Sequence, residues 1–371
     1  MILLTIVVFI AILGLLVFVH ELGHFVAAKK SGMKVDEFGF GFPPRIFGIK
    51  KGETIYSINL IPLGGFVKIV GENGESSDPQ SFGHKPAWQR FIVLIAGVTM
   101  NVVLAWVLIS FALSIGWPTL VNEGDQLPRN VIIKNVSVGI LEVAKDSPAD
   151  KAGLKPEDYI LKIGSKPVNS IQEAQDLTKA AADKPTVYRI KRGKDIFEKT
   201  LTPRSKPPQG QGALGVALGS IGEIVYPWYQ APIKGLQVTF NLIVLTVTAF
   251  YSLIGQALHG GNVGAALSGP IGIAVLTRDM TAMGFIYLLR FTALISINLA
   301  IINVMPFPAL DGGRILFLLI EKIRGKKMKE TAEAWANTVG FMLLILLMIV
   351  VTVKDIAHYS EGFKHLFQRI F

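Results

Sequence analysis

The stretch ILLTIVVFIAILGLLVFVHELGH, which runs from Ile2 to His24, decides the fold. Residues 2–19 carry no charged side chain, and with the HELGH turn they are long enough to cross a membrane as one helix. No basic segment precedes this apolar run, and no small-residue cleavage site follows it. We therefore expect a retained membrane span and not a signal peptide.

The HELGH turn has the spacing of a zinc-peptidase signature. Two histidines four residues apart lie about 40° apart around a helix and about 6 Å apart along its axis. Both imidazoles of His20 and His24 can therefore bind one ion, and Glu21 is placed to act as general base on an activated water. Chance is one alternative, because an accidental HExxH arises in roughly one such chain per hundred. A structural metal site, or histidines bonded to helix carbonyls, is the other.

The composition agrees with a membrane protein. Hydrophobic residues make up 51% of the 371 residues and charged residues 17%, whereas a soluble domain carries about 25% charge. The net charge of +10 fits lysine and arginine in cytoplasmic loops, and no nucleic-acid-binding motif is present in the sequence. The chain has no cysteine, which excludes disulfides, cysteine-bound zinc and thiol catalysis. Metal ligands must come from the six histidines and the carboxylates.

The later apolar segments predict the number of spans. They lie at 91–117, 233–258, 284–304 and 335–353. Lysine and arginine mark residues 25–90 and 321–329 as cytoplasmic, so an odd number of crossings separates 321–329 from an outside domain at 125–204. Because Asn241 and several Thr and Ser interrupt the segment 233–258, we expect it to lie on the membrane surface or to line a cavity. The prediction is four spans with both termini outside, and five spans is the alternative.

Charge and periodicity divide the chain into four parts. They are a first membrane part at 1–124, a soluble α+β domain at 125–204, a linker with an amphipathic or membrane-surface helix at 205–283, and a second membrane part at 284–371. Within the first part, a Gly/Phe-rich loop precedes a β region at about 54–70, which turns between Pro62 and Gly65. The α+β domain is predicted from a helical stretch near 171–181 and from β-type runs at Val131–Val136, Tyr159–Ile163, Val187–Arg192 and Phe197–Thr202.

The segment NVMPFPALDGGR, residues 303–314, supplies a candidate third ligand. Its two prolines break a helix, and Asp311 follows at membrane depth, where a carboxylate needs a cationic partner. With His20 and His24, Asp311 would complete a zinc site of two histidines and one carboxylate. Gly312 and Gly313 would let the backbone turn sharply and aim the carboxylate inward. The alternative is a helix cap or an ion pair between Asp311 and Arg314.

HELGH and NVMPFPALDGG together resemble the site-2 protease family of intramembrane zinc metalloproteases, in its bacterial form related to the regulator of sigma-E protease. The resemblance covers nearly the whole chain. It implies one zinc ion per chain, bound by His20, His24 and Asp311, with Glu21 as the catalytic base. The corresponding asparagine of the second span is Asn101. Family members often carry a Gly-Pro pair shortly before it, whereas this chain has Gly97-Val98-Thr99-Met100, so a supporting role of Asn101 in the site stays open.

The resemblance also implies residues that hold the substrate. Asn303 would bind the substrate backbone or the oxyanion, and the β region around Gly64, Gly65 and Phe66 would hold the substrate as an added strand. The second role also has a physical basis, since an unwound membrane helix must find new partners for its backbone groups. A plain structural hairpin is the alternative.

The soluble domain resembles a single bacterial PDZ domain. The stretch DSPADKAGLKPEDYI, residues 146–160, carries the likeness, with Ser147 as N-cap of a short helix and Gly153 at its end. The residues Val138, Gly139, Ile140 and Leu141 would form the loop whose amides bind a chain terminus. A steric filter that excludes bulky substrates is an equally weighted role for this domain.

These features predict an intramembrane zinc endopeptidase of the bacterial cytoplasmic (inner) membrane. It would cleave single-span proteins, such as anti-sigma factors, or remnant signal peptides. Its soluble domain would be extracytoplasmic, and its active site would lie towards the cytoplasm. A catalytically silent membrane PDZ adaptor is one alternative and a metal transporter is another. The remaining histidines, for which we expect surface positions, are His84, His259, His358 and His365.

Overall fold

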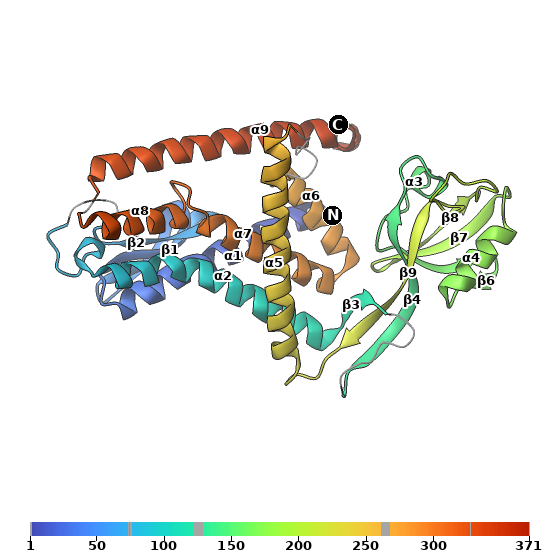
Figure 1. Ribbon diagram of the computed structural model, residues 1–371, viewed down its shortest axis with the longest axis horizontal. Coiled ribbons are helices and arrows are strands. Elements are labelled where there is room, and N and C mark those ends of the chain that lie inside the picture. The colour runs from blue at the N-terminus through green and yellow to red at the C-terminus, as the bar shows by residue number, and fades with distance from the viewer. Residues whose placement is uncertain are drawn as a thin grey trace. The chain divides into compact units, whose positions relative to one another are not determined.

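Figure 1 shows the computed structural model, which describes residues 2–370 except 73, 75, 122–128, 261–267 and 327. The chain forms two compact units. The helical unit comprises Met1–Leu108, Gln237–Asp279 and Phe291–Phe371, and the sheet unit comprises Ile109–Leu236 and Met280–Arg290. A mainly β unit is thus inserted between helical segments, which agrees with the predicted combination of membrane helices and β sheet.

Among the described residues, five helices are long and apolar enough to cross a membrane. They are α1 (Ile2–Lys30), α2 (Ala87–Ile115), α5 (Ala231–Leu258), α7 (Phe285–Val304) and α9 (Glu330–Ile370). Within the 18-residue apolar stretch of each helix, the protein buries only 6% of the residues in α9. It buries 39% in α2, which is the most covered of the five. Apolar side chains that the protein leaves uncovered are those that lipid can cover, so the chain is a multi-pass membrane protein.

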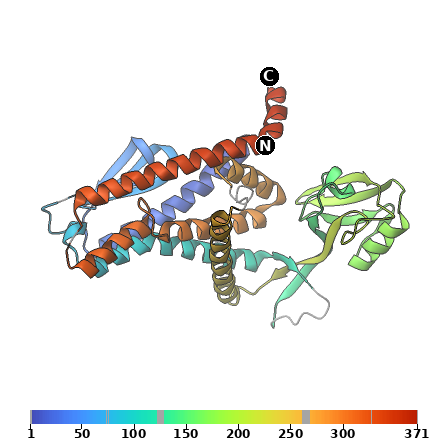
Figure 2. The same ribbon diagram turned by 45° about the horizontal axis from the view of Figure 1, so that its top comes forward.

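Helix α5 is the segment that the sequence predicts to lie on the membrane surface or to line a cavity. It is 28 residues long. The mean hydropathy of its most apolar stretch, 1.8, is the lowest among the five apolar helices of the described chain. In Figures 1 and 2, α5 lies across the direction followed by α1, α2 and α9. Length and composition therefore admit a fifth span, while its direction sets this helix apart.

The helical unit contains a small β structure formed by β1 (Val35–Lys51) and β2 (Thr54–Ile69). Residues Glu37 to Phe40 of β1 each have two partners in β2, one in 55–58 and one in 65–68. Strand β2 therefore reverses between these two stretches, where the sequence predicts a turn. The stretch 65–69 pairs with β1 on one side only, which makes it an edge of the sheet.

The sheet unit is built on a seven-stranded sheet with the order β3-β9-β4-β5-β7-β8, in which β6 also pairs with β5. The strands are β3 (Trp117–Leu120), β4 (Ile132–Val143), β5 (Tyr159–Ile163), β6 (Lys166–Pro167), β7 (Thr186–Arg192), β8 (Asp195–Leu201) and β9 (Val216–Val225). Helices α3 (Pro148–Lys151) and α4 (Ile171–Ala180) accompany it. The core contains Ile140, Ile160, Tyr188 and Ile190, all at most 1% exposed.

The sheet extends beyond the predicted domain of residues 125–204. Strand β3 precedes it, and β9 lies in the predicted linker and pairs with both β3 and β4. The glycines and polar residues of β9 (VALGSIGEIV) interrupt the apolar alternation that identifies a strand, which explains why the sequence did not reveal it. Of the four predicted β runs, Tyr159–Ile163 coincides with β5, and the other three overlap β4, β7 and β8.

Three shorter elements complete the described chain. They are the 3-10 turn η1 (Phe82–His84), α6 (Pro270–Met283) and α8 (Asp311–Arg324). Helix α8 ends at Gly325, whose φ of 65° gives the left-handed cap typical of a helix C-terminus. Its first residue is the aspartate that the sequence assigns to the metal.

Candidate metal centre

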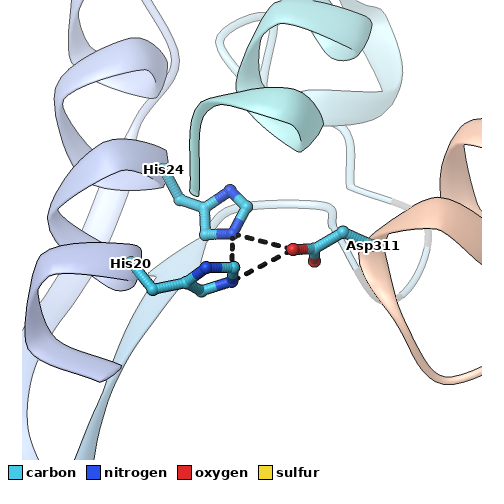
Figure 3. Close-up of side chains that lie close together, drawn as sticks. All are labelled: His20, His24 and Asp311. Carbon is cyan, nitrogen blue, oxygen red and sulfur yellow. Dashed lines mark hydrogen bonds and ion pairs between the residues drawn. The ribbon is translucent and has the colours of Figure 1, made fainter. Parts of the chain in front are cut away.

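Helix α1 carries His20 and His24 on one face, towards α2. The imidazoles are 7% exposed each, and their ring centroids lie 4.8 Å apart (Figure 3). A Cβ atom on Gly97 of α2 would lie 2.8 Å from Cε1 of both histidines, which is closer than real contacts allow. The absence of a side chain at Gly97 therefore lets α2 pack directly against the two rings.

Asp311 meets the two histidines from a segment almost 290 residues later in the chain. Its Oδ2 lies 3.0 Å from His20 Nε2 and 3.4 Å from His24 Nε2, and the two Nε2 atoms are 3.2 Å apart (Figure 3). Zinc bonds of about 2.0–2.1 Å in a tetrahedron place neighbouring ligand atoms about 3.3 Å apart. The three observed distances fit one face of such a tetrahedron. Among the described residues, this is the one group of three or more histidine, cysteine, aspartate or glutamate side chains that could hold a metal ion.

Hydrogen bonds behind the rings leave both Nε2 atoms free for a metal. His24 Nδ1 lies 2.8 Å from the carbonyl oxygen of Val93 and can only donate to it. With hydrogen on Nδ1, a neutral His24 cannot donate from Nε2 to Asp311, whose Oδ2 is buried and has no hydrogen-bond partner. A buried carboxylate oxygen facing two lone pairs requires a cation between them.

The other histidine is held by Asn101 of α2. The amide nitrogen of Asn101 lies 3.2 Å from His20 Nδ1, while its Oδ1 is buried without a partner. Amide oxygen and nitrogen are assigned from the hydrogen-bond network, and a rotation by 180° lets Oδ1 accept from His20 Nδ1–H. Asn101 is fully buried, and Ser296 Oγ donates to its backbone oxygen at 2.8 Å. The asparagine without an assigned role in the sequence thus orients a candidate ligand.

The two glycines after Asp311 act differently from the prediction. Both lie in the first turn of α8, and neither has a positive φ, so they do not provide a sharp turn. A Cβ on Gly312 would overlap the carbonyls of Val304 and Met305, and one on Gly313 would lie 2.8 Å from the carbonyl carbon of Phe307. These glycines allow α8 to pack closely against the loop before it. Arg314 pairs with Glu72 and not with Asp311.

Glu21 lies between the two histidines in sequence and beside the edge stretch of β2 in space. Its Oε2 accepts a hydrogen bond of 3.1 Å from the backbone N–H of Val67. A Cβ on Gly65 would stand 3.7 Å from Glu21 Cγ, so this edge passes directly over the glutamate. Glu21 is half-buried, which leaves part of it open to a cavity.

That cavity, of about 1540 Å³, lies within the helical unit. Glu21, His24, Asp311, Gly65 and Phe66 contribute to its wall. Polar and charged residues continue the wall away from the metal group, and these include Glu72, His84, Arg90, Arg314, Glu321 and Asn337. A cavity of this size and polarity can admit water and an unwound peptide segment to the three candidate ligands.

The remaining predicted site residues are distributed as follows. Gly64 adjoins the cavity-lining Gly65 and has a φ of 150°, and a Cβ atom at this position would lie 3.2 Å from side-chain atoms of Phe42 and Val17. Asn303 is half-buried in the last turn of α7 and is not among the described residues that line the cavity. His84 contacts Ser81 Oγ at 2.7 Å, and exposed His259 contacts the carbonyl oxygen of Gly255. The side chains of His358 and His365 lie outside the described part of the structure.

The predicted peptide loop Val138, Gly139, Ile140 and Leu141 belongs to β4, in the interior of the seven-stranded sheet. Val138 and Gly139 have partners in both β5 and β9, and the N–H of Ile140 donates to the backbone oxygen of Asp158. A loop that binds a carboxylate must offer free amides, which residues paired on both sides do not have. This arrangement does not favour Val138 and Gly139 for that role, and binding of a chain terminus by the four residues stays a prediction.

Sequence comparisons give the relatives of the chain. The model for peptidase family M50 matches residues 8–347. The zinc metalloprotease RasP of Geobacillus kaustophilus is 30% identical, over 96% of this chain and 98% of its own. The regulator of sigma-W protease RasP of Bacillus subtilis is also 30% identical, over 95% and 98%. A protein of Clostridium acetobutylicum whose name also describes a zinc metalloprotease is 34% identical, over 95% and 98%.

Proposed function

Since the chain belongs to peptidase family M50, the site-2 protease family of zinc metalloproteases, we propose that it cleaves membrane-spanning segments of other proteins within the bilayer. The observation that carries the proposal is the convergence of His20, His24 and Asp311 beside Glu21 in a polar cavity of a multi-pass membrane protein. Water is needed for hydrolysis, and the cavity supplies a route for it that does not cross lipid.

The zinc ligands in this proposal are His20 Nε2, His24 Nε2 and one oxygen of Asp311. His24 Nδ1–H donates to the carbonyl oxygen of Val93, and with the Asn101 amide rotated His20 Nδ1–H donates to its Oδ1, so both Nε2 atoms carry lone pairs in this proposal. When bound, zinc supplies a Lewis acid that lowers the pKa of water and polarises a carbonyl group. Three protein ligands leave a fourth position open for this chemistry.

Glu21 moves the proton. It stands next to His20 in sequence and opens on the same cavity as Asp311, so its carboxylate can take a proton from the attacking water. The same carboxylate can then return the proton to the nitrogen of the departing chain. The hydrogen bond from Val67 N–H holds one carboxylate oxygen and leaves the other available. Asn303 is assigned contact with the substrate backbone or the oxyanion.

The edge of β2 binds the substrate as an added strand. Backbone N–H groups of successive residues in a strand point to opposite sides. Val67 N–H points away from β1, to Glu21, so Gly65 N–H points to the same outer side. An unwound substrate segment can pair with these groups and present its scissile carbonyl next to Glu21. Gly64, Gly65 and Phe66 are the substrate-binding residues in this arrangement.

The substrates fitting this site are single-span membrane proteins, such as anti-sigma factors, or remnant signal peptides. A transmembrane helix hides its amides in internal bonds and must unwind before it can reach the strand edge. A relative is named as the regulator of sigma-W protease, a name that agrees with a role in releasing a regulator of transcription.

The chain is proposed to lie in the bacterial cytoplasmic membrane with four spans and both termini outside. The basic residues of 25–90 and 321–329 favour a cytoplasmic position for the cavity. The sheet unit is then extracytoplasmic, and the crosswise direction of α5 favours a helix on the membrane surface. We assign the sheet unit to a PDZ-type domain that limits the size of substrates or binds their chain ends.

Exchange of Glu21 for glutamine tests the proposal. The Glu21→Gln chain, reconstituted with a single-span model substrate, should bind one zinc ion per chain but cleave about a thousandfold more slowly. Loss of activity without loss of zinc separates a catalytic base from a structural residue. Turnover equal to that of the unchanged protein would reject the assignment, and absence of zinc in both proteins would reject the metal site.

A further inference from the structure

A second cavity, of about 360 Å³, lies in the sheet unit at the ends of two membrane helices. Trp117 begins β3 directly after α2, and Tyr287 and Arg290 belong to the start of α7. Glu157 precedes β5, and Tyr159 is the first residue of that strand. The cavity has the size of a small-molecule site. It shares no wall residue with the zinc site proposed above.

Arg290 provides a phosphate-binding group in this cavity. Its guanidinium carbon lies 4.6 Å from the centre of the Trp117 ring and 5.9 Å from that of the Tyr287 ring. Stacking on aromatic faces holds the guanidinium but leaves the N–H groups in its plane free to donate. This fork of donors matches two oxygens of a phosphate.

Glu157 provides a cation-binding group, the negatively charged counterpart of Arg290 in the same cavity. Its Oε2 is buried and has no hydrogen-bond partner. Burial raises the pKa of the carboxyl group above its usual value, and the positive charge of Arg290 opposes this shift. The φ of Glu157 is 68°, a left-handed conformation in which glycine would carry no strain. A strained backbone position thus places a residue with an unpartnered carboxylate oxygen in the cavity wall.

The aromatic residues complete the wall. The hydroxyl groups of Tyr159 and Tyr287 share a hydrogen bond of 3.1 Å, which fixes the two rings against each other. Aromatic faces attract ammonium groups as well as guanidinium groups. The cavity therefore offers a donor for an anion, an acceptor for a cation and aromatic faces around both.

We propose that this cavity binds the phosphoethanolamine head group of a membrane lipid. Arg290 donates to the phosphate, and the primary ammonium donates to Glu157 Oε2 beside the ring of Trp117. The position of the cavity favours a lipid as the source. Helix α2 ends at Ile115 and α7 begins at Phe285, so the cavity lies where two apolar helices leave the membrane.

Ordinary anchoring at the membrane surface explains only part of these features. Tryptophan and tyrosine are enriched at both surfaces of a membrane without selecting a head group. An aromatic belt does not require a buried carboxylate, and Glu157 gains nothing from contact with hydrocarbon. In the last turns of α2 and at the start of α7, Phe111 and Phe285 contact each other edge to face with centroids 6.5 Å apart, which provides apolar surface for acyl chains.

Titration of the purified full-length protein with lipids, followed by native mass spectrometry, tests the proposal. Phosphatidylethanolamine, phosphatidylglycerol and phosphatidylcholine with the same acyl chains are the probes. The Glu157→Gly chain should bind phosphatidylethanolamine about tenfold more weakly, with affinity for phosphatidylglycerol unchanged. Because the backbone at this position favours glycine, its thermal stability should not fall. Arg290→Gln should weaken binding of both lipids about tenfold.

Three further measurements make the result decisive. Glu198→Gln removes an exposed carboxylate from β8 and should leave every affinity unchanged. Free O-phosphoethanolamine should displace the lipid only at far higher concentration, and equal potency would reject a lipid as the occupant. Phosphatidylcholine, whose ammonium has no N–H group, should bind more weakly than phosphatidylethanolamine. An unchanged preference for phosphatidylethanolamine in Glu157→Gly would overturn the proposal.

Discussion

Two carboxylates with buried oxygen atoms, Asp158 and Asp311, have opposite surroundings. Asp158 in the sheet unit accepts from Arg192 Nε at 2.6 Å, from the Arg192 amino group at 2.7 Å and from Lys155 N–H at 2.9 Å. Asp311 in the helical unit faces two imidazole nitrogens, and its Oδ2 has no hydrogen bond. A structural carboxylate receives its partners from the chain, whereas a carboxylate left without them is available for a cation from outside.

The largest effect is expected at Asp311. The exchange Asp311→Asn keeps the shape of the side chain but removes its charge, so a neutral amide must replace an anionic ligand. Zinc content should fall to background, and cleavage of a single-span substrate should fall by about a thousandfold or more. Elemental analysis and a reconstituted cleavage assay measure both. A zinc-loaded Asp311→Asn protein would mean that the third ligand is another residue.

A smaller loss is expected at Asn101, which acts through His20. The exchange Asn101→Ala removes the amide that fixes the imidazole, and residues in this position typically change metal affinity by about 10–100-fold. Competition with a chelator measures the affinity. Excess zinc should restore most of the cleavage rate, as it would not in Glu21→Gln. Unaltered affinity would show that the carbonyls and packing around His20 suffice to orient it.

A change at the β2 edge should impair cleavage without affecting the metal. The exchange Gly65→Pro removes an outward N–H group, and its Cβ would lie 2.9 Å from the carbonyl oxygen of Gly39 in β1, so the edge must also shift. Both effects weaken substrate pairing, and cleavage should slow at least about tenfold. Zinc content should remain at one ion per chain, as measured by elemental analysis on the same sample. Full cleavage activity would identify β1 and β2 as a structural hairpin only.

Exchange of Asp158 should have the smallest effect on catalysis and completes the comparison. In Asp158→Asn, Arg192 loses its ionic partner, and breaking a buried pair costs about 3 kcal/mol of stability. Hydrogen exchange in β4, β5 and β7 should therefore accelerate, while zinc content stays constant. Loss of zinc in this variant would contradict the separation between a carboxylate that stabilises the fold and one that binds metal.

The fold and the site differ in how well the sequence predicts them. Length and hydropathy predicted the apolar helices α1, α2, α7 and α9, because each must be apolar along a full membrane thickness. The spacing of HELGH depends only on helix geometry, so it holds before any packing is known. In contrast, the extent of the sheet unit depends on the pairing of β3 and β9, which are far apart in sequence and weakly patterned.

Residues that act through another residue were the hardest to predict. Gly97 and Asn101 lie four residues apart on one face of α2, but an apolar helix gives no sign of which face meets α1. Val93 acts through its backbone carbonyl oxygen, so the type of its side chain gives no indication of this role. For Val138 and Gly139 a local likeness suggested free amides, whereas both residues have partners in β5 and β9.

The sequence alone determined the chemistry of the proposed site, because side-chain types and helical spacing limit which atoms can bind a metal. It supplied two histidines, a glutamate and a late aspartate, and with them the family resemblance. Only the tertiary structure decided that Asp311 Oδ2 stands 3.0 Å from His20 Nε2 and that Glu157 Oε2 has no hydrogen-bond partner. The reason is physical: whether a buried charge is satisfied depends on what surrounds it in space, and distant segments provide those surroundings.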